Sequence, residues 1–180
     1  MKKRAVIFDL DGTLIDSGNE GLRRILAIAQ RRGLPIDQSI ETKLRGMWGK
    51  PAIQLISACW PDTDAHDFHH EWEELDNSEP IPLFPGTREA LWALRVRGLA
   101  QGVFTSRRRV TASVQISANG LSLFFWNVQT LEDSTFKKPD PKSIEPTLKK
   151  FAELGIGTEN ILYVGDSIQA DWMLAQALGV

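Results

Sequence analysis

The sequence predicts an α/β fold in which a parallel, Rossmann-like sheet is covered by helices on both faces. The first observation is a set of short apolar runs with few polar interruptions, as expected for strands buried on both faces. The second is that helical periodicity separates these runs, an alternation typical of a parallel sheet. The predicted strands are residues 5–8, 102–106, 123–128 and 161–166.

A long helical insertion follows the first predicted strand. Residues 17–78 contain no strand pattern, and the proline-rich segment 79–86 separates them from the later strands. We therefore expect two domains, a core of residues 1–16 and 80–180 and an all-helical insertion of residues 17–79. Within the insertion, helices are predicted at about residues 17–32, 39–44, 51–59 and 64–75.

The helices of the core have recognisable start and stop signals. Thr87 is predicted to cap the first of them, which runs to about Arg97 and is closed by Gly98. Pro141 suits the first turn of a later helix, and Gly155 suits its carboxyl end. The predicted core helices are residues 87–97, 107–117, 141–154 and 168–178.

The composition is that of an ordinary globular protein. Of 180 residues, 42% are hydrophobic and 24% are charged, and the formal net charge of −2 gives no general attraction to nucleic acid or anionic membranes. The single cysteine, Cys59, excludes an intrachain disulfide and is interpreted as a core residue. We expect a reducing, cytoplasmic location, because the first apolar run is broken at Asp9 and no stretch approaches the length of a membrane span.

Two carboxylates end the first predicted strand. Asp9 and Asp11 follow its apolar run directly, at the edge of an open α/β sheet where ligands bind. Residues two apart on an extended chain point the same way, so these side chains repel each other unless a cation lies between them. The pair suits one aspartate acting as a nucleophile beside Mg²⁺ and the other as a general acid/base. Gly12 then leaves room for a phosphate to approach the backbone.

Three further segments carry polar groups suited to phosphoryl chemistry. Thr105 ends the second predicted strand, and its hydroxyl can donate to a phosphate oxygen. Lys138 lies in a proline-restricted segment, where a rigidly held lysine can neutralise a transferring phosphoryl group. Asp166 ends the fourth strand and Asp171 lies in the first turns of the next helix, and carboxylate oxygens are ligands that Mg²⁺ takes. Each signal alone also fits an ordinary strand end, loop or helix start.

The order and spacing of these groups resemble the haloacid dehalogenase (HAD) superfamily. Its four motifs are matched in order by Asp9-x-Asp11-Gly12-Thr13, by Thr105, by Lys138 and by Gly165-Asp166-Ser167-x-x-x-Asp171. The resemblance covers essentially the whole chain. It implies a HAD-like core with an inserted helical cap, of the kind found in phosphoglycolate-phosphatase-like and β-phosphoglucomutase-like members.

By this resemblance, four side chains carry out the reaction. Asp9 is the nucleophile that forms an aspartyl-phosphate, and Asp11 protonates the leaving oxygen and later activates water. Thr105 and Lys138 hold the phosphoryl group, and Lys138 also steadies Asp9. Such chemistry depends mainly on positioning and charge neutralisation, which agrees with the residue types present.

The resemblance also implies a Mg²⁺ site. The ion is held by Asp9, Asp166 and the backbone carbonyl of Asp11, while Asp171 orients Lys138 or a metal-bound water. The supporting residues are Gly12, Ser106, Ser167 and Asp171. Ser106 stands where many family members have asparagine.

The implied function is a Mg²⁺-dependent phosphatase acting on a small phosphorylated metabolite. Asp11 favours phosphoryl transfer over carbon–halogen cleavage, since dehalogenating relatives lack an acid at that place. Three alternatives stay open: a sugar phosphomutase, phosphonate cleavage through a cap lysine such as Lys43 or Lys50, and a non-catalytic regulatory or binding protein on the same fold. No nucleic-acid or membrane partner is expected, and the sequence is compatible with a monomer or a dimer.

In such enzymes a loop of the helical cap reads the substrate, and here that loop is residues 45–50. Arg45 and Lys50 can bind an anionic second group of a phosphorylated metabolite, and Trp48 can shape the pocket. The alternative is a solvated basic turn. A second basic cluster, the three arginines at 107–109, is predicted to be a solvated helix start, because the run is short for a nucleic-acid patch and the protein is acidic.

The predicted core has one strand fewer than most members of the family. Such proteins usually continue past the fourth strand into a fifth strand and a closing helix, whereas this sequence ends at Gly179-Val180. We therefore expect a core sheet from which the fifth strand is missing.

Overall fold

The protein divides into two compact units in the computed structural model, which describes residues 2–180. The core unit comprises residues 2–16 and 80–180, and the cap unit is Ser17–Glu79. The chain thus passes between the units at Asp16 and again at Pro80, where the proline-rich segment lies.

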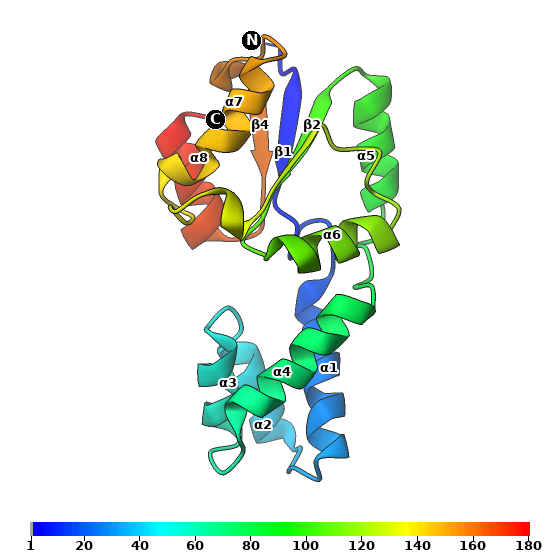
Figure 1. The fold of residues 1–180 in the computed structure, drawn as a ribbon, viewed down its shortest axis with the longest axis vertical. Helices are drawn as coiled ribbons and strands as arrows, with labels where there is room; N and C mark the ends of the chain where they lie inside the picture. The colour runs from blue at the N-terminus through cyan, green and yellow to red at the C-terminus, as the bar shows by residue number, and fades with distance from the viewer. Residues whose placement is uncertain (1) are drawn as a thin grey trace. The chain divides into compact units, whose positions relative to one another are not determined.

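The core unit contains a four-stranded parallel sheet with the strand order β3-β2-β1-β4 (Figure 1). Its strands are β1 (Ala5–Phe8), β2 (Ala100–Phe104), β3 (Asn127–Gln129) and β4 (Ile161–Val164). The register places Phe8 of β1 beside Val103 of β2 and Val164 of β4, so the carboxyl ends of these strands form one edge. The predicted α/β class with a parallel sheet is therefore confirmed.

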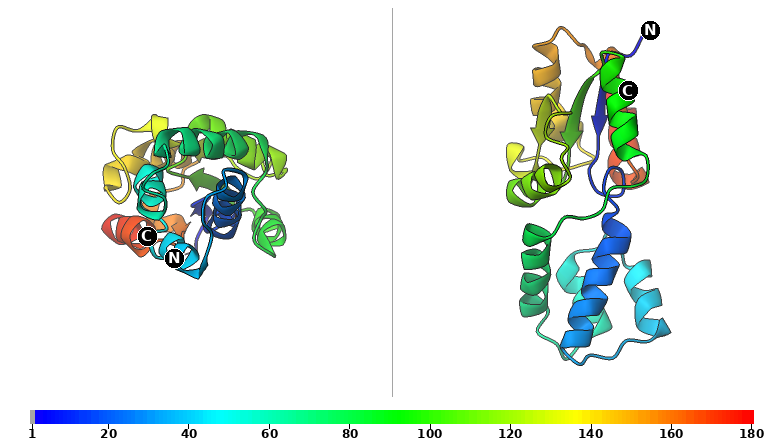
Figure 2. Two further views of the ribbon diagram at one scale, coloured as in Figure 1. Left: turned by 90° about the horizontal axis from the view of Figure 1, so that it is seen from below. Right: turned by 90° about the vertical axis from the view of Figure 1, so that its right-hand side faces the viewer.

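Helices cover both faces of this sheet (Figure 2). They are α5 (Thr87–Val96), α6 (Arg109–Ala118), α7 (Glu145–Ala152) and α8 (Met173–Leu178). Val6 and Phe8 of β1 join an apolar cluster with residues of α5 and α6, whereas Ala5 and Ile7 join a cluster with residues of α7 and α8. Because both faces are covered, all four residues of β1 are buried, which explains the uninterrupted apolar run.

The cap unit is helical throughout its regular structure, as predicted. Its helices are α1 (Ser17–Arg31), α2 (Gln38–Gly46), α3 (Ala52–Cys59) and α4 (Ala65–Ser78). A buried stripe of α1 that includes Ile25 and Ile28 belongs to the same apolar cluster as Leu44 of α2 and Phe68 of α4. Cys59 is buried in this cluster, so its interpretation as a core residue is confirmed.

The third strand is shorter than the prediction of residues 123–128, because β3 comprises only Asn127–Gln129. Leu123 is 84% exposed, and the N–H of Phe124 donates to the carbonyl of Leu121 in a turn. Within residues 123–128, Phe124, Phe125 and Val128 are partly buried and pack against the core cluster that contains Leu121. The apolar run therefore reflects a turn packed on the sheet rather than a long strand.

The start of α5 also differs from the prediction. Gly86, with φ of 84°, occupies the cap position, and Thr87 is the first helical residue. The Thr87 hydroxyl donates to the carbonyl of Leu14 at 3.2 Å. It therefore ties α5 to the loop after β1 and does not cap the helix.

Two predicted core helices are composite. The helix predicted at 168–178 begins with a π-helical turn, Ile168–Trp172, before α8. The one predicted at 141–154 begins with a 3₁₀ turn before α7, and the 3₁₀ turns are Leu131–Asp133, Pro141–Ile144 and Thr158–Asn160. Among residues 2–180, no helix combines the length and the apolar character that crossing a bilayer requires.

Candidate active site

The carboxyl edge of the sheet gathers side chains that are distant in the sequence. Asp9 follows β1, Thr105 follows β2, and Asp166 lies just beyond β4. Lys138 comes from the loop between β3 and α7. Because the strands are parallel and in register, their ends converge, as is usual for ligand sites in open α/β sheets.

Lys138 lies at the centre of this edge. Its Nζ donates to Oδ1 of Asp9 and to Oδ1 of Asp171, both at 2.8 Å. Its side chain is 4% exposed, and Nζ lies 4.8 and 5.6 Å from the ring centroids of Phe104 and Tyr163. The rings and the two carboxylates together fix the position of the cation.

Asp171 is buried and accepts several hydrogen bonds. Besides Lys138, the hydroxyl of Tyr163 donates to Oδ1 at 2.9 Å, and the N–H of Ser167 donates to Oδ2 at 3.1 Å. Burial raises the pKa of Tyr163, so its phenol stays protonated and remains a donor. Gly165 makes room for this acid, because a Cβ there would lie 2.4 Å from Cγ of Asp171. These contacts orient Asp171 toward Lys138.

The other two acids of the edge have perturbed pKa values. Burial raises the pKa of Asp9 to about 6, with the charge of Lys138 opposing the rise and the charges of Asp171 and Asp11 adding to it. Burial also raises the pKa of Asp166, and the charges of Asp171 and Asp11 again add to the effect. Nearby cations therefore do not fully stabilise the charged form of either carboxylate. Perturbed pKa values of this kind are common at functional sites.

Asp9, Asp166 and Asp171 form a candidate metal group. One carboxylate oxygen from each lies within 4.8 Å of the others. These hard oxygen donors suit Mg²⁺, and the raised pKa values of Asp9 and Asp166 agree with a cation being favourable there. Asp171 accepts hydrogen bonds at both oxygens, from Lys138 and Tyr163 at Oδ1 and from Ser167 at Oδ2, whereas Asp9 accepts from Lys138 at Oδ1. Asp9 and Asp166 are therefore the better placed ligands.

The backbone at Gly12 shows why glycine is needed there. Its φ is 69°, and a Cβ at this position would lie 2.3 Å from Oδ2 of Asp166. The structure therefore adds a reason to the predicted one. Gly12 makes room for the acid that follows β4.

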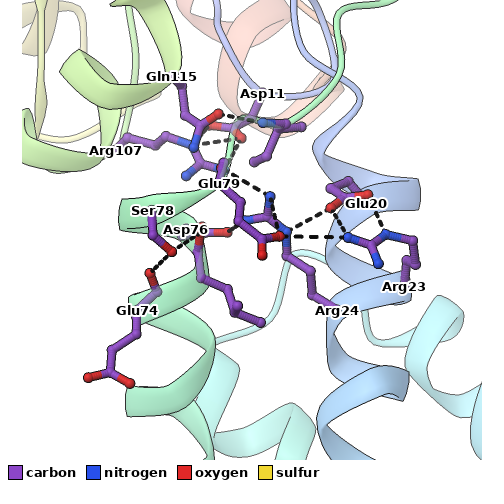
Figure 3. Close-up of polar contacts among 12 residues, drawn as sticks. Asp11, Glu20, Arg23, Arg24, Glu74, Asp76, Ser78, Glu79, Arg107 and Gln115 are labelled. Atoms are coloured by element: carbon purple, nitrogen blue, oxygen red, sulfur yellow. Dashed lines mark hydrogen bonds and ion pairs between the residues drawn. The ribbon is translucent and has the colours of Figure 1, made fainter. Parts of the chain in front are cut away.

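Asp11 is held by Arg107, a residue that was predicted to lie in a solvated helix start and not in the site. Nε of Arg107 donates to Oδ1 and Oδ2 of Asp11 at 2.9 and 2.8 Å, and Nη2 donates to Oδ1 at 2.8 Å (Figure 3). The Arg107 side chain is only 15% exposed and precedes α6, so the prediction of a solvated helix start is wrong for this residue. Arg108 and Arg109 are exposed, as that prediction requires.

The remaining predicted core residues surround this centre. Thr105 is buried, and its Oγ1 accepts the N–H of Arg107 at 3.1 Å. Ser106 is exposed and lines a small recess together with Thr105 and Lys138. The Ser167 hydroxyl accepts the N–H of Ala170 at 3.1 Å and caps the π-helical turn.

The three cap residues predicted to bind substrate lie at the end of α2 and in the loop after it. Arg45 and Lys50 are exposed. Trp48 packs within the cap unit, 6.1 Å from Trp72 between ring centroids, and covers Gly21, where a Cβ would lie 2.4 Å from the Trp48 ring. Trp48 thus has a packing role in the cap unit, and substrate binding by these residues stays a prediction.

Two residues of the edge were missed by sequence reasoning, and only one of them had a usable signal. Arg107 comes two residues after Thr105, so its position at a strand end could have included it in the site. Tyr163 lies within an apolar strand, where a tyrosine is commonplace. Its bond to Asp171 depends on the turn beyond β4, which has no local sequence signal.

Comparison with known proteins agrees with the fold. The model of the haloacid dehalogenase-like hydrolase family matches residues 6–180, so this chain belongs to that family and the predicted resemblance is confirmed. The pyrophosphatase PpaX of Oceanobacillus iheyensis is 28% identical over 168 residues, which cover 93% of this chain and 76% of the relative. A phosphoglycolate phosphatase of Cereibacter sphaeroides is 32% identical over 186 residues, which cover 97% of this chain and 81% of the relative.

Solved structures show the same fold. The HAD-hydrolase YfnB of Bacillus subtilis, in a crystal form bound to magnesium, matches with a TM-score of 0.85 and 20% identity. The match covers 100% of this chain and 87% of YfnB. At this identity the likeness establishes a shared fold and nothing finer.

Proposed function

We propose that the protein is a Mg²⁺-dependent phosphatase that hydrolyses a small phosphorylated metabolite through an aspartyl-phosphate on Asp9. The observation that carries the proposal is the buried amine of Lys138, held 2.8 Å from both Asp9 and Asp171 at the carboxyl edge of the sheet. Phosphoryl transfer depends on positioning and charge neutralisation, which this arrangement supplies. The relatives named as a pyrophosphatase and a phosphoglycolate phosphatase support the same class of reaction.

In the first half-reaction, a carboxylate oxygen of Asp9 forms a bond to phosphorus while the bond from phosphorus to the leaving oxygen breaks. Asp11 gives the leaving oxygen a proton. An ammonium has three donors, and Lys138 uses two of them for Asp9 and Asp171, so the third is assigned to an oxygen of the phosphoryl group. The hydroxyl of Thr105 is assigned to another phosphoryl oxygen.

In the second half-reaction, Asp11 accepts a proton from a water as the water oxygen bonds to phosphorus. The bond between phosphorus and Asp9 breaks, inorganic phosphate leaves, and the Asp9 carboxylate is restored. Lys138 keeps Asp9 in place throughout because its second partner, Asp171, is itself held by Tyr163 and Ser167.

The oxygen donors at this edge fit Mg²⁺. We assign the ion to the carboxylates of Asp9 and Asp166 and the backbone carbonyl of Asp11. When bound, it offsets the negative charge of the phosphoryl group. The raised pKa values of Asp9 and Asp166 support the assignment.

Hydrolysis of p-nitrophenyl phosphate tests the proposal. Wild type is compared with Asp9→Asn and with Glu159→Gln, a control acid in the turn before the amino end of β4. We expect turnover by wild type and by the control that requires Mg²⁺ and is abolished by a chelator. Asp9→Asn should lose roughly 10³-fold or more. Equal activity in Asp9→Asn, or no turnover by wild type with Mg²⁺, would refute the proposed reaction.

Trapping of the intermediate tests the covalent step separately. Acid quenching during turnover of a phosphate-labelled substrate should leave label on wild type and none on Asp9→Asn. Hydroxylamine should release the label, because it cleaves acyl phosphates. Hydrolysis rates for a panel of 2-phosphoglycolate, pyrophosphate and hexose phosphates then identify the preferred substrate class. Transfer of label between positions of a hexose phosphate would indicate a mutase instead.

A further inference from the structure

Three acids at the carboxyl edge of the sheet are close enough to share one cation. Asp9, Asp166 and Asp171 each offer a carboxylate oxygen, and these oxygens lie within 4.8 Å of one another. Mg²⁺ is usually bound by few carboxylates and keeps several waters, whereas Ca²⁺ takes about six to eight oxygen ligands in a more flexible shell. The number of acids that reach the ion therefore influences which of the two cations the site prefers.

Asp171 is the acid whose oxygens are occupied by donors from the protein. Its Oδ1 accepts from Nζ of Lys138 at 2.8 Å and from the hydroxyl of Tyr163 at 2.9 Å, and its Oδ2 accepts from the N–H of Ser167 at 3.1 Å. An ionised carboxylate has about four acceptor positions, so Lys138 and Tyr163 together use both positions of Oδ1. Asp171 is 2% exposed, and these donors fix the orientation of its carboxylate.

The hydroxyl of Tyr163 is the donor that can be separated from the rest of the site. Lys138 also contacts Asp9, and the donor of Ser167 belongs to the backbone. The Tyr163 ring is held independently of the hydroxyl, because it packs on the apolar cluster that includes residues of α7 and α8. The strand and the ring thus present the phenol to Oδ1 of Asp171 from a fixed position.

We propose that Tyr163 is a positioning residue that keeps Asp171 from binding the metal ion, and thereby sets a preference for Mg²⁺ over Ca²⁺. The proposal rests on the metal site assigned above and adds a determinant of its cation choice. With the hydroxyl in place, Asp171 is committed to Lys138 and Tyr163. Without the hydroxyl, Oδ1 has an acceptor position for a cation, and a third carboxylate favours the ion with the larger shell.

Calorimetric titration of the metal-free protein with Mg²⁺ and with Ca²⁺ tests the proposal without turnover. The quantity compared is Kd for Ca²⁺ divided by Kd for Mg²⁺. The variants are Tyr163→Phe, which removes only the hydroxyl, Asp171→Asn, and the two substitutions together. Asp166→Asn removes an assigned ligand and should weaken the binding of both ions, which checks that the titration reports this edge of the sheet.

We expect Tyr163→Phe to lower the ratio of the two Kd values by roughly 10-fold, mainly through tighter binding of Ca²⁺. A merely structural role of Tyr163 would weaken the binding of both ions alike and leave the ratio unchanged. In the Asp171→Asn background, Tyr163→Phe should change the ratio by less than about twofold, because the hydroxyl acts through Asp171.

Nuclear magnetic resonance supplies a second measurement that needs no substitution of Tyr163. The sequence contains a single tyrosine, so tyrosine labelled with ¹³C at Cζ gives one protein signal. Asp171→Asn should move this signal in the metal-free protein, because the acceptor of the hydroxyl changes. Addition of Mg²⁺ to wild type should move it less than that substitution does. A larger movement would show that Asp171 leaves Tyr163 for the ion, and the proposal would be wrong.

The titrations can overturn the proposal in two further ways. The ratio of the Kd values could stay the same in Tyr163→Phe, or it could fall equally in the variant that also carries Asp171→Asn. Thermal unfolding checks that the variants fold, and the signal of the labelled wild type decides the matter if Tyr163→Phe does not. The phosphatase function fails separately, as a protein that binds Mg²⁺ but shows no Asp9-dependent hydrolysis of p-nitrophenyl phosphate. Binding of neither ion would refute the assigned metal site together with this proposal.

Discussion

The core unit and the cap unit each bury one cationic side chain among carboxylates, but the acids around the two cations differ. In the core unit, Lys138 contacts Asp9, and burial still raises the pKa of Asp9 to about 6. In the cap unit, Arg24 contacts Glu20, whose pKa is lowered by hydrogen bonds from Arg23 and Arg24. The first acid is under-stabilised in its charged form and the second is well stabilised.

Desolvation of Asp9 by burial and the number of donors around Glu20 together explain this difference between the two pKa values. The Arg24 side chain is 1% exposed, and its guanidinium donates to Glu20 and Asp76 at 2.8 Å and to the carbonyl of Glu79 at 3.1 Å (Figure 3). These contacts join α1 to the end of α4. Glu20 also accepts two hydrogen bonds from Arg23, so it has donors from two arginines.

The comparison separates the arrangement proposed for catalysis from a structural one. Asp9 shares its single amine with Asp171, which leaves it able to take a metal ion or a phosphoryl group. Glu20 has its charge satisfied by donors from two arginines. Burial of a cation alone therefore says little about function, whereas the protonation preference of its acids says more.

Lys138→Met should produce the largest effect. We expect activity to fall by roughly 10²–10³-fold, since the buried cation beside Asp9, the proposed nucleophile, is lost. The free energy of unfolding should fall less than a buried ion pair suggests, because Asp9 takes up a proton readily. Initial rates and urea unfolding measure the two effects. Lys137→Met, at the exposed neighbour, is the control, and similar activity in both variants would contradict the comparison.

Arg24→Met should affect stability in the cap unit. The substitution leaves Glu20 and Asp76 without their buried partner, so we expect unfolding to become easier by roughly 3–5 kcal/mol in urea titrations. Arg23→Met is the matched control, because its side chain is 61% exposed and its pair with Glu20 should contribute at most about 1 kcal/mol. Equal losses in the two variants would show that burial of Arg24 is not what matters.

Mg²⁺ should stabilise one unit and leave the other unchanged. At about 100 times its dissociation constant, a ligand of the folded state stabilises by about 2.7 kcal/mol. We expect hydrogen–deuterium exchange to slow in the loops after β1 and β4 and to stay the same in α1 and α4. Asp166→Asn should remove the effect. Slower exchange in the cap helices alone would place the ion elsewhere.

Lowering the pH should stabilise the metal-free core unit, by less than the changes in stability predicted for Arg24→Met and for Mg²⁺. The folded-state pKa of Asp9, about 6, lies above its ordinary value of 3.8. Protonation of Asp9 therefore adds to the free energy of unfolding in full below pH 3.8, and this stabilisation is lost as the pH rises through 6. Between pH 7 and pH 5 this predicts a gain of about 1 kcal/mol in the free energy of unfolding. Asp9→Asn is the control and should lack this gain.

The cap acids should respond with the opposite sign. The folded-state pKa of Glu20 is lowered below 4.5, so its contribution is present above 4.5 and is lost as the pH falls through the folded value. The difference in the free energy of unfolding between wild type and Glu20→Gln should therefore become smaller in strong acid. A gain in wild-type stability from Glu20 below pH 4 would contradict the assignment.

The fold was largely predictable because strand ends and helix periods are local signals. The apolar run Ala5–Phe8 indicates a strand that is buried on both faces, and the acids after it indicate where the strand ends. The short β3 was not predictable, since apolar residues such as Phe124 pack on the core equally well from a turn. Thr87 was predicted to cap a helix, but its hydroxyl donates instead to the carbonyl of Leu14, which is distant in the sequence.

The candidate site was predictable in its residue types and less so in its contacts. The resemblance to the family implied that Asp9, Lys138 and Asp171 lie near one another, and Nζ of Lys138 lies 2.8 Å from an oxygen of each acid. The partner of Asp11 was not expected. Three consecutive arginines look the same whether they are solvated or paired, and only the tertiary fold brings Arg107 to an acid 96 residues away.

Gly12 and Asp166 constrain each other's evolution, although they lie in the first and last motifs of the chain. A Cβ at position 12 would lie 2.3 Å from the carboxylate, and the backbone there is left-handed, so every other residue type displaces the acid or strains the loop. A saturation library at position 12 should yield glycine alone among active clones. Changes in substrate range must therefore arise at positions that leave this pair intact.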